Sequence, residues 1–433
     1  MSFSVILLFL GLSLPASAGY ETAVAGVRVD DLQVAWLDGL LARDAAQLLR
    51  DEKLENILSD NSLYMEMFRR AAALPNDGRL LSPAAAPDSV SSAPDYGPHL
   101  KLFRLLLLDA RRKAASGQRR GAETNLLAAA GFIAQLAEQK EARLLSALTL
   151  EVCLGKAYPY LAVSLRGSNP SPSYMTELAA RLGRARNGLA AAPEAMKEEA
   201  ELAKSLLRGT VNPEKATLER GVMPFYRRYA MRRLHNEDYF KLVYSRFDAV
   251  ADARAAALMR AFETNDPASA ENFLKEQLAE LAAKDRNKGS LGFVDGYKLT
   301  VGDAHGARSA MADSAVHAFA ASSVTEYWKL IPGYHAAASM LDVLRSALAV
   351  KEFQRRRGRL PDGLARLVPA FLPEVPADPF NKFAPLSYSP RGRSFTIHGF
   401  GPDGDDDGAA KVLDHAAFKA KEPRTDGDII YTD

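Results

Sequence analysis

Apolar residues recur three and four positions apart along most of the chain, a spacing typical of amphipathic helices. The pattern predicts helices from residue 20 to about 75, from 99 to about 207 and from 213 to 285. It predicts a further long helix from about residue 334 to 357, which Gly358 is expected to end. Representative apolar positions in these segments are Leu37, Leu40, Leu102, Phe103, Leu126, Ile133, Val243, Phe247, Leu341 and Leu344.

Segments rich in proline, glycine and small polar residues interrupt the helical pattern. Residues 76–98 are expected to form a loop or linker, and the glycine-rich residues 286–310 a second loop. Residues 312–330 are expected to be helical. Pro332 and Gly333 are expected to break the chain before the next helix begins.

The helical pair that begins at His99 is similar to a tetratricopeptide-type hairpin, with Gly117 in its turn and alanines in its second helix. That repeat has a period of about 34 residues and characteristic Trp, Tyr and Pro positions, which this sequence does not reproduce. We therefore favour an irregular helical domain, with a true repeat as the alternative.

The character of the chain changes after Arg359, because repeated prolines forbid long helices. Residues 387–389 and 393–398 are expected to be strands joined by a turn at residues 390–392, and residues 428–432 a third strand. The predicted fold class is therefore mainly α. A helical domain precedes a small α+β domain, in which a long helix accompanies an antiparallel sheet of three to four strands.

The first residues have the features of a secretory signal peptide. An apolar run from Ser4 to Leu14 is followed by small residues at Ala16 and Ala18, which predicts cleavage after Ala18. The run is shorter than the roughly 20 apolar residues that span a bilayer. We expect export to the periplasm or the extracellular space and no membrane span after signal cleavage. An uncleaved N-terminal anchor is the alternative.

These features divide the chain into four expected parts. They are a signal peptide at 1–18, an N-terminal helical segment with its linker at 19–98, a helical domain at 99–332 and a C-terminal domain at 333–433. The helical region and the last hundred residues each have an apolar periodicity of their own. We therefore expect the helical region to fold without the C-terminal domain.

The net charge and the cysteine content bear on the class of partner and on disulfide bonding. The formal net charge is +2, from 55 basic and 53 acidic side chains, and this balance does not suggest a nucleic-acid-binding protein. The single cysteine, Cys153, cannot form an intramolecular disulfide. It lies in an apolar segment and is expected to be a small core residue.

Four motifs follow one another in the last hundred residues. They are Gly358 to Pro361, Asp378 to Phe380, Phe400 to Gly404, and Gly427 to Ile429. In this order they resemble the globular half of the major pseudopilin of type II secretion systems, a module also similar to the C-terminal part of large exported bacterial proteins. The resemblance implies a small sheet around a calcium loop, with Asp403 and Asp428 as matching side chains, and a link to secretion or envelope assembly.

The sequence departs from the pseudopilin pattern at several points. It has no prepilin leader followed by a methylated aromatic residue and a glutamate within a hydrophobic helix. Asn381 replaces the usual glycine after the Asp-Pro-aromatic motif, and a longer insertion that contains lysine separates Gly408 from Gly427. We therefore do not expect the chain to assemble as a pseudopilus subunit.

The acidic loop contains the candidate metal ligands. Calcium requires about six to eight oxygen ligands at short range. Asp403, Asp405 and Asp407 alternate on a glycine-bearing turn, and Asp428 follows the insertion. These four aspartates are the predicted ligands of a structural calcium ion.

Two arrangements of calcium ligands are compatible with the sequence. In the pseudopilin arrangement, Asp403 and Asp428 bind the ion together with backbone carbonyls. In an EF-hand-like arrangement, Asp403, Asp405 and Asp407 take the first, third and fifth positions. Asp414 then takes the twelfth, where an EF-hand usually has glutamate. A solvated acidic turn that binds no ion is the third possibility.

The sequence contains no recognised catalytic motif. Its seven histidines are scattered without the spacing of a zinc site, and His398 is expected to be structural. We expect a non-catalytic exported protein whose helical domain binds an unidentified protein partner. The alternative is a periplasmic enzyme with its site in the helical domain. A deep polar pocket with converging acids or histidines between residues 99 and 285 would favour the enzyme, and a concave helical groove without titratable clusters would favour binding.

Overall fold

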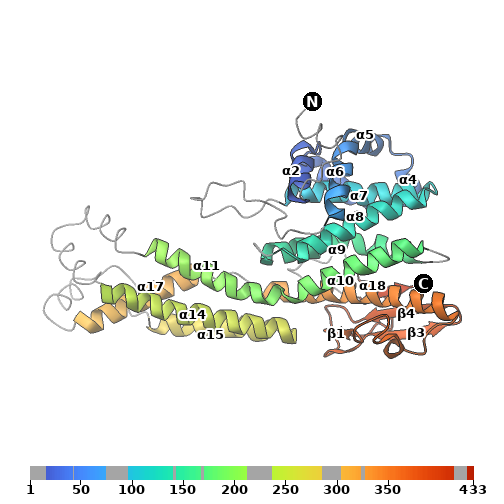
Figure 1. Ribbon diagram of the computed structural model, residues 1–433. Coiled ribbons are helices and arrows are strands. Elements are labelled where there is room, and N and C mark those ends of the chain that lie inside the picture. Colours follow the sequence, from blue (N-terminus) through green and yellow to red (C-terminus); the bar gives the residue numbers. More distant parts are fainter. Residues whose placement is uncertain are drawn as a thin grey trace. The chain divides into compact units, whose positions relative to one another are not determined.

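The computed structural model describes a mainly helical chain with a small antiparallel sheet near its end, which confirms the predicted fold class (Figure 1). The chain divides into two compact units, Met1–Ala192 with Pro332–Asp433, and Pro193–Ile331. The described residues are 16–41, 43–74, 96–139, 143–166, 170–211, 237–284, 304–322, 327–413 and 427–433.

The first unit opens with short helices. They are α2 (Ala16–Gly26), α3 (Asp31–Leu41), α4 (Ala45–Leu48), α5 (Glu52–Asp60) and α6 (Ser62–Ala73). Asp51 begins α5 because its carboxylate accepts the backbone N–H of Leu54 at 3.0 Å. The buried rings of Tyr20, Phe68 and Phe132 pack edge to face or tilted, which joins these helices to the next layer.

Four longer helices form the centre of this unit. They are α7 (Gly97–Ala115), α8 (Arg119–Ala137), α9 (Arg143–Leu165) and α10 (Pro172–Ala190). Helix α8 contacts α6, α7, α9 and α10. Its Gly131 lies so close to the Ala72 carbonyl that a Cβ atom there would overlap it. The predicted turn between α7 and α8 is confirmed, with Gly117 at φ 77°. Cys153 is buried in α9, as expected.

The C-terminal residues of this unit form α18 (Ile331–Arg357), the 3-10 turn η3 (Leu364–Leu367) and two small sheets. Strands β1 (Ala377–Asp378) and β2 (Ala384–Pro385) pair with each other. Strands β3 (Ser387–Arg391), β4 (Ser394–Gly399) and β5 (Ile429–Thr432) form an antiparallel sheet in that order. Ile397 in the middle strand is paired with Tyr388 on one side and Tyr431 on the other.

The two ends of α18 test the sequence-based boundaries. Gly358 follows the helix with φ 71° and donates its N–H to Gln354, which confirms the predicted C-terminal stop. The predicted break at Pro332 is wrong, because α18 already begins at Ile331. A proline in the first turn of a helix removes an N–H that has no partner inside the helix, so it is tolerated there.

Helix α18 and the sheet share one hydrophobic core with the N-terminal helices. The Tyr158 hydroxyl of α9 donates to the Ile430 carbonyl of β5 at 3.0 Å. Arg186 of α10 forms an ion pair at 2.8 Å with Asp342, a buried residue of α18. Residues 333–433 are thus grouped with residues 1–192, which differs from the boundaries expected from the sequence. The reason is that α18 is buried nearly all round, and not along a single apolar stripe.

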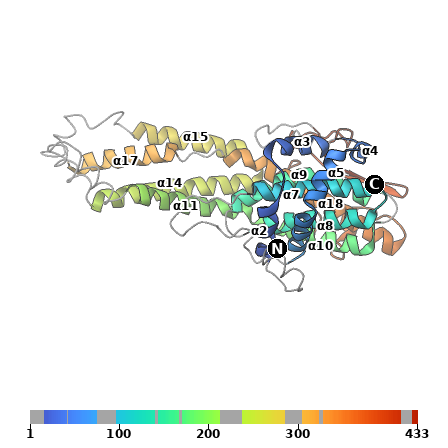
Figure 2. The same ribbon diagram turned by 90° about the horizontal axis from the view of Figure 1, so that it is seen from above.

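The second unit consists of helices. They are α11 (Ala195–Thr210), α14 (Glu237–Thr264), α15 (Pro267–Lys284) and α17 (Ala304–Ser322), with a short 3-10 turn η2 (Tyr327–Leu330). Helix α14 contacts α11, α15 and α17, and Figure 2 shows the four running side by side. The loop predicted for 286–310 is wrong in its last part, since α17 begins at Ala304.

Several sequence-based expectations fall outside the described residues. They concern the apolar run of the signal peptide, most of the linker at 76–98, the helix at 213–236, most of the loop at 286–310, and Asp414. Among the helices that the structure describes, none combines the length and the apolar character needed to cross a bilayer.

Candidate cation site in the C-terminal loop

The acidic loop begins where β4 ends and closes on the segment that starts β5. The Leu413 N–H donates to the Asp428 carbonyl, and the Asp428 N–H donates to the Lys411 carbonyl, both at 2.9 Å. Gly427 is required at this closure, because its φ is 118° and a Cβ atom would lie 2.8 Å from the Leu413 nitrogen. Backbone contacts therefore hold the two ends of the loop together.

Three carboxylates converge inside this loop. One oxygen each of Asp403, Asp405 and Asp407 lies within 4.8 Å of the others. Asp403 Oδ1 and Asp407 Oδ2 are buried and accept no hydrogen bond from the described residues. The negative charge of Asp403 is the main cause that raises the pKa of Asp405 above its ordinary value. The arrangement is electrostatically unfavourable by itself, since buried acceptors normally have a donor or a cation.

Asp428 has a different environment. Its side chain is fully buried and accepts the backbone N–H of Ala409 at 2.8 Å and of Asp407 at 3.4 Å. Its carboxylate lies near His398 and Asp406, whose own Nε2 and Oδ1 atoms are 3.3 Å apart. Burial is the main cause that raises the pKa of Asp428. In this structure Asp428 holds the backbone of the loop in place.

The Asp-Pro-aromatic motif supports the start of the same loop. Asp378 is buried, and its two oxygens accept the N–H groups of Phe380 at 3.0 Å and Phe400 at 2.7 Å. Burial is the main cause that raises the pKa of this carboxyl group. The motif thus connects the turn after β1 to the end of β4, and its carboxylate points to backbone donors.

The four predicted ligands therefore fall into two groups. The structure brings Asp403, Asp405 and Asp407 together and places Asp428 with His398 and Asp406. The first group fits a hard cation, because two of its buried oxygens have no donor and all three residues supply oxygen. Sequence reasoning missed the two residues beside Asp428. It placed His398 in the strand but had no signal for what its ring would meet across the loop.

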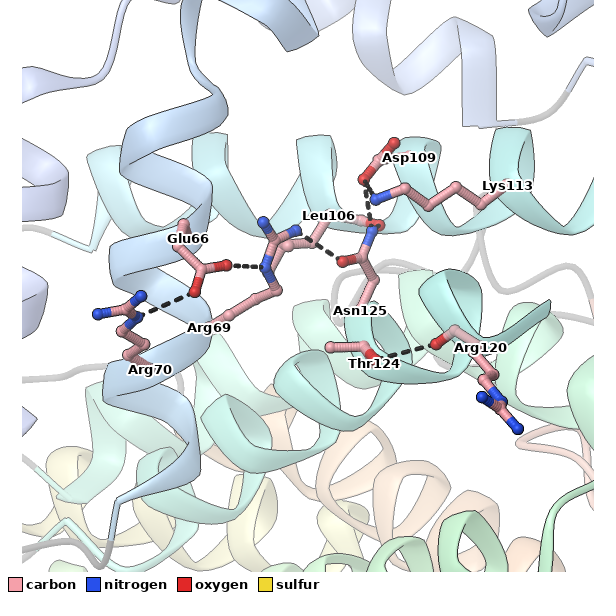
Figure 3. A network of polar contacts seen from close by, with 9 residues as sticks. All are labelled: Glu66, Arg69, Arg70, Leu106, Asp109, Lys113, Arg120, Thr124 and Asn125. Atoms are coloured by element: carbon pink, nitrogen blue, oxygen red, sulfur yellow. Dashed lines mark hydrogen bonds and ion pairs between the residues drawn. The ribbon is translucent and has the colours of Figure 1, made fainter. Parts of the chain in front are cut away.

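A second cluster of charged groups lies between α6, α7 and α8, and Figure 3 shows its members. Arg69 donates to Glu66 at 3.0 Å and to Asn125 at 2.8 Å. Asn125 in turn donates to Asp109 at 2.7 Å, and Lys113 donates to the same carboxylate at 2.6 Å. Each carboxylate here pairs with at least one cation, so the cluster joins three helices through balanced ion pairs and hydrogen bonds.

Comparisons of the chain with protein-family models, with curated proteins and with solved structures found no match. The chemistry of the acidic loop therefore rests on its own residues. These are the three converging carboxylates and the buried aspartates that hold the backbone around them.

Proposed function

We propose that the protein is an exported, non-catalytic binding or scaffold protein whose C-terminal part is stabilised by calcium. The observation that carries the calcium proposal is the convergence of Asp403, Asp405 and Asp407, two of which have buried oxygens without a hydrogen-bond donor. The similarity of the C-terminal motifs to the major pseudopilin supports the same proposal and suggests a link to secretion or envelope assembly.

The three loop aspartates would supply oxygen ligands, and the ion would supply positive charge. Without a cation, the carboxylates repel one another, as the raised pKa of Asp405 indicates. An ion that binds the folded form stabilises it by mass action, by about 2.7 kcal/mol at a hundredfold excess over its dissociation constant. Asp428 supports the loop through the N–H groups of Asp407 and Ala409 in either state.

The binding role rests on a separate observation in the second unit. A pocket between its helices is lined mainly by apolar side chains, among them Phe247, Leu258 and Leu274. A mainly apolar pocket of this kind is typical of a site that binds a ligand. The charged cluster between α6 and α8 is internally paired, which also supports a structural role for that region.

Melting temperatures of the full chain in excess calcium and in excess chelator test the calcium proposal. We expect a higher melting temperature with calcium, and Asp403→Ala should remove most of the gain, because it deletes one hard ligand and its charge. Identical melting of the natural chain in both conditions would overturn the proposal.

The same measurement on Asp414→Ala separates the two arrangements of ligands. A lost calcium response would favour the EF-hand-like arrangement, in which this residue takes the twelfth position. An unchanged response would leave the ion with Asp403 and its neighbours.

A further inference from the structure

Positive charge is concentrated at the C-terminal end of α18. Residues 351–366 contain six basic and two acidic side chains, and Arg391 and Arg393 flank Gly392 in the turn that joins β3 to β4. The whole chain has a formal net charge of only +2, so the remaining residues together are acidic. We call six of these side chains the basic surface: Arg355, Arg356, Arg357, Arg359, Arg391 and Arg393.

Two elements present the basic surface together. The side-chain amide of Gln354 in α18 donates to the Arg393 carbonyl at 3.0 Å. Arg391 is paired with Ser394 across the hairpin of β3 and β4. All six arginines of the surface are exposed. The last turn of the helix and the tip of the hairpin therefore lie side by side, and their charges add.

Local carboxylates neutralise part of this charge. A single carboxylate, that of Glu352, pairs with both Arg355 and Arg356, at 2.7 Å and 2.6 Å. Asp362 pairs with Arg359 at 3.2 Å, and both of these side chains are mostly exposed. Two carboxylates thus serve three guanidinium groups, which leaves an excess of positive charge within this group.

The other three arginines have no acidic partner among the residues that the structure describes. They are Arg357, Arg391 and Arg393. A helix C-terminus favours nearby cations, but its dipole is equivalent to only about half a negative charge. Arg357 lies in the last turn of α18, whereas Arg391 and Arg393 lie outside the helix. The basic surface therefore keeps most of its excess positive charge exposed to solvent.

We propose that the basic surface binds the headgroup layer of an anionic phospholipid membrane. A guanidinium group matches a phosphate in charge and in geometry, and its planar fork can bind two oxygens at once. Exposed arginines on two neighbouring elements can contact several phosphates of one lipid layer, and clustered basic side chains are attracted to anionic lipid surfaces in this way. The attraction is electrostatic, so it falls off within a Debye length, about 8 Å at physiological ionic strength.

The choice of a lipid surface rests on the export proposed above, because an exported protein passes a membrane. The balanced charge of the whole chain also differs from that of a nucleic-acid-binding protein, in which basic residues are in clear excess. The contact with lipid does not require calcium. The lipid experiment can therefore fail while the calcium proposal stands, and the reverse.

Co-sedimentation of the full chain with lipid vesicles, in excess chelator, tests the inference. One set of vesicles contains phosphatidylcholine alone, and the other contains equal parts of phosphatidylcholine and phosphatidylglycerol. We expect tighter binding to the anionic vesicles, and the difference should disappear at about 0.5 M sodium chloride, where screening is strong. The apolar run at the N-terminus meets both kinds of vesicle, so it does not produce a difference between them.

The combined variant Arg357→Gln, Arg391→Gln and Arg393→Gln removes the three charges without an acidic partner. A cation near an anionic surface strengthens binding roughly fivefold, so this variant should bind anionic vesicles roughly a hundredfold more weakly. The combined variant Arg357→Lys, Arg391→Lys and Arg393→Lys keeps the charge and should keep most of the binding.

A matched control removes three exposed arginines from other parts of the same compact unit: Arg43→Gln, Arg50→Gln and Arg120→Gln. It lowers the net charge equally, and its binding to anionic vesicles should stay nearly unchanged. Equal binding of the natural chain to both kinds of vesicle, or equal losses in the two glutamine variants, would overturn the proposal. Displacement by soluble glycerol phosphate, or tighter binding to a DNA duplex than to the anionic vesicles, would also overturn it.

Discussion

The cluster between α6, α7 and α8 and the acidic loop after β4 both contain several carboxylates. In the cluster the carboxylates pair with cations, whereas in the loop they lie beside one another. In the helical cluster, Asp109 accepts from Lys113 and from Asn125, which also contacts Arg69. In the loop, the nearest charged neighbours of Asp405 are Asp403 and Asp407. The first cluster is complete within the protein, and the second gains from an added cation.

The difference teaches how to distinguish a structural carboxylate from a candidate ligand. A structural carboxylate, such as Asp378 or Asp428, accepts backbone N–H groups on its oxygens. A candidate ligand, such as Asp403 or Asp407, keeps one buried oxygen without a donor, even where the other oxygen accepts a backbone N–H, as Asp403 does from Gly427 at 2.8 Å. Sequence alone does not separate the two classes, because all four are aspartates beside glycine or proline turns.

The largest loss of stability is expected when a carboxylate is removed from the charged cluster between α6, α7 and α8. Asp109→Ala leaves Lys113 without its acceptor and leaves the buried amide of Asn125 with only the Leu106 carbonyl at 3.4 Å, so the free energy of unfolding should fall by about 2 to 3 kcal/mol. Chemical denaturation measures it, and calcium should not change the result. Asp362→Ala is the matched control, since its pair with Arg359 is mostly exposed and is worth about 0.5 kcal/mol. Equal losses in both variants would contradict the account.

Asp428→Ala tests whether this aspartate holds the backbone of the acidic loop or binds the ion. The N–H groups of Asp407 and Ala409 lose their acceptor, which should destabilise the protein by about 1 to 3 kcal/mol. The loss should be nearly the same in calcium and in chelator, because the structure gives Asp428 a backbone-holding role. A loss confined to calcium-containing buffer would instead support the arrangement in which Asp428 binds the ion.

A third environment for a carboxyl group is that of Glu151, a residue of α9 whose side chain lies against Gly333 at the start of α18. Burial raises its pKa from 4.5 to about 7. The folded protein therefore holds the proton more tightly than the unfolded chain, and stability should fall as pH rises through this window. Glu151→Gln should have little effect at pH 4 and stabilise by roughly 1 to 3 kcal/mol at pH 8. An equal effect at both pH values, measured by denaturation, would contradict this.

The sequence was sufficient for the helices and for the order of the C-terminal strands, because apolar spacing and proline or glycine positions determine both. It could not show that α18 is buried on nearly all sides. Asp342 is buried in this helix, where Arg186 and Arg345 pair with it. Pairing between residues that are far apart in the sequence leaves no local pattern. The domain boundary predicted before α18 therefore differs from the boundaries of the compact units.

The acidic loop was predictable as a group of residues, but its internal division was not. Alternation on a glycine-bearing turn indicated Asp403, Asp405 and Asp407 together, and the structure places them together. The position of Asp428 depends on how Gly427 lets two backbone segments meet, which a sequence pattern does not encode. The partner of His398, Asp406, depends on the same closure.

The most direct test of the account is the melting temperature of Asp405→Asn beside Asp406→Asn, each in chelator and in calcium. Asp405→Asn removes one of three repelling carboxylates, so it should melt above the natural chain in chelator and gain less from calcium. Asp406→Asn removes the same charge from a residue whose carboxylate accepts the Gly408 N–H at 2.8 Å, and it should keep most of the calcium gain. If Asp405→Asn melts at or below the natural chain in chelator and gains as much from calcium, the three carboxylates do not form a cation site.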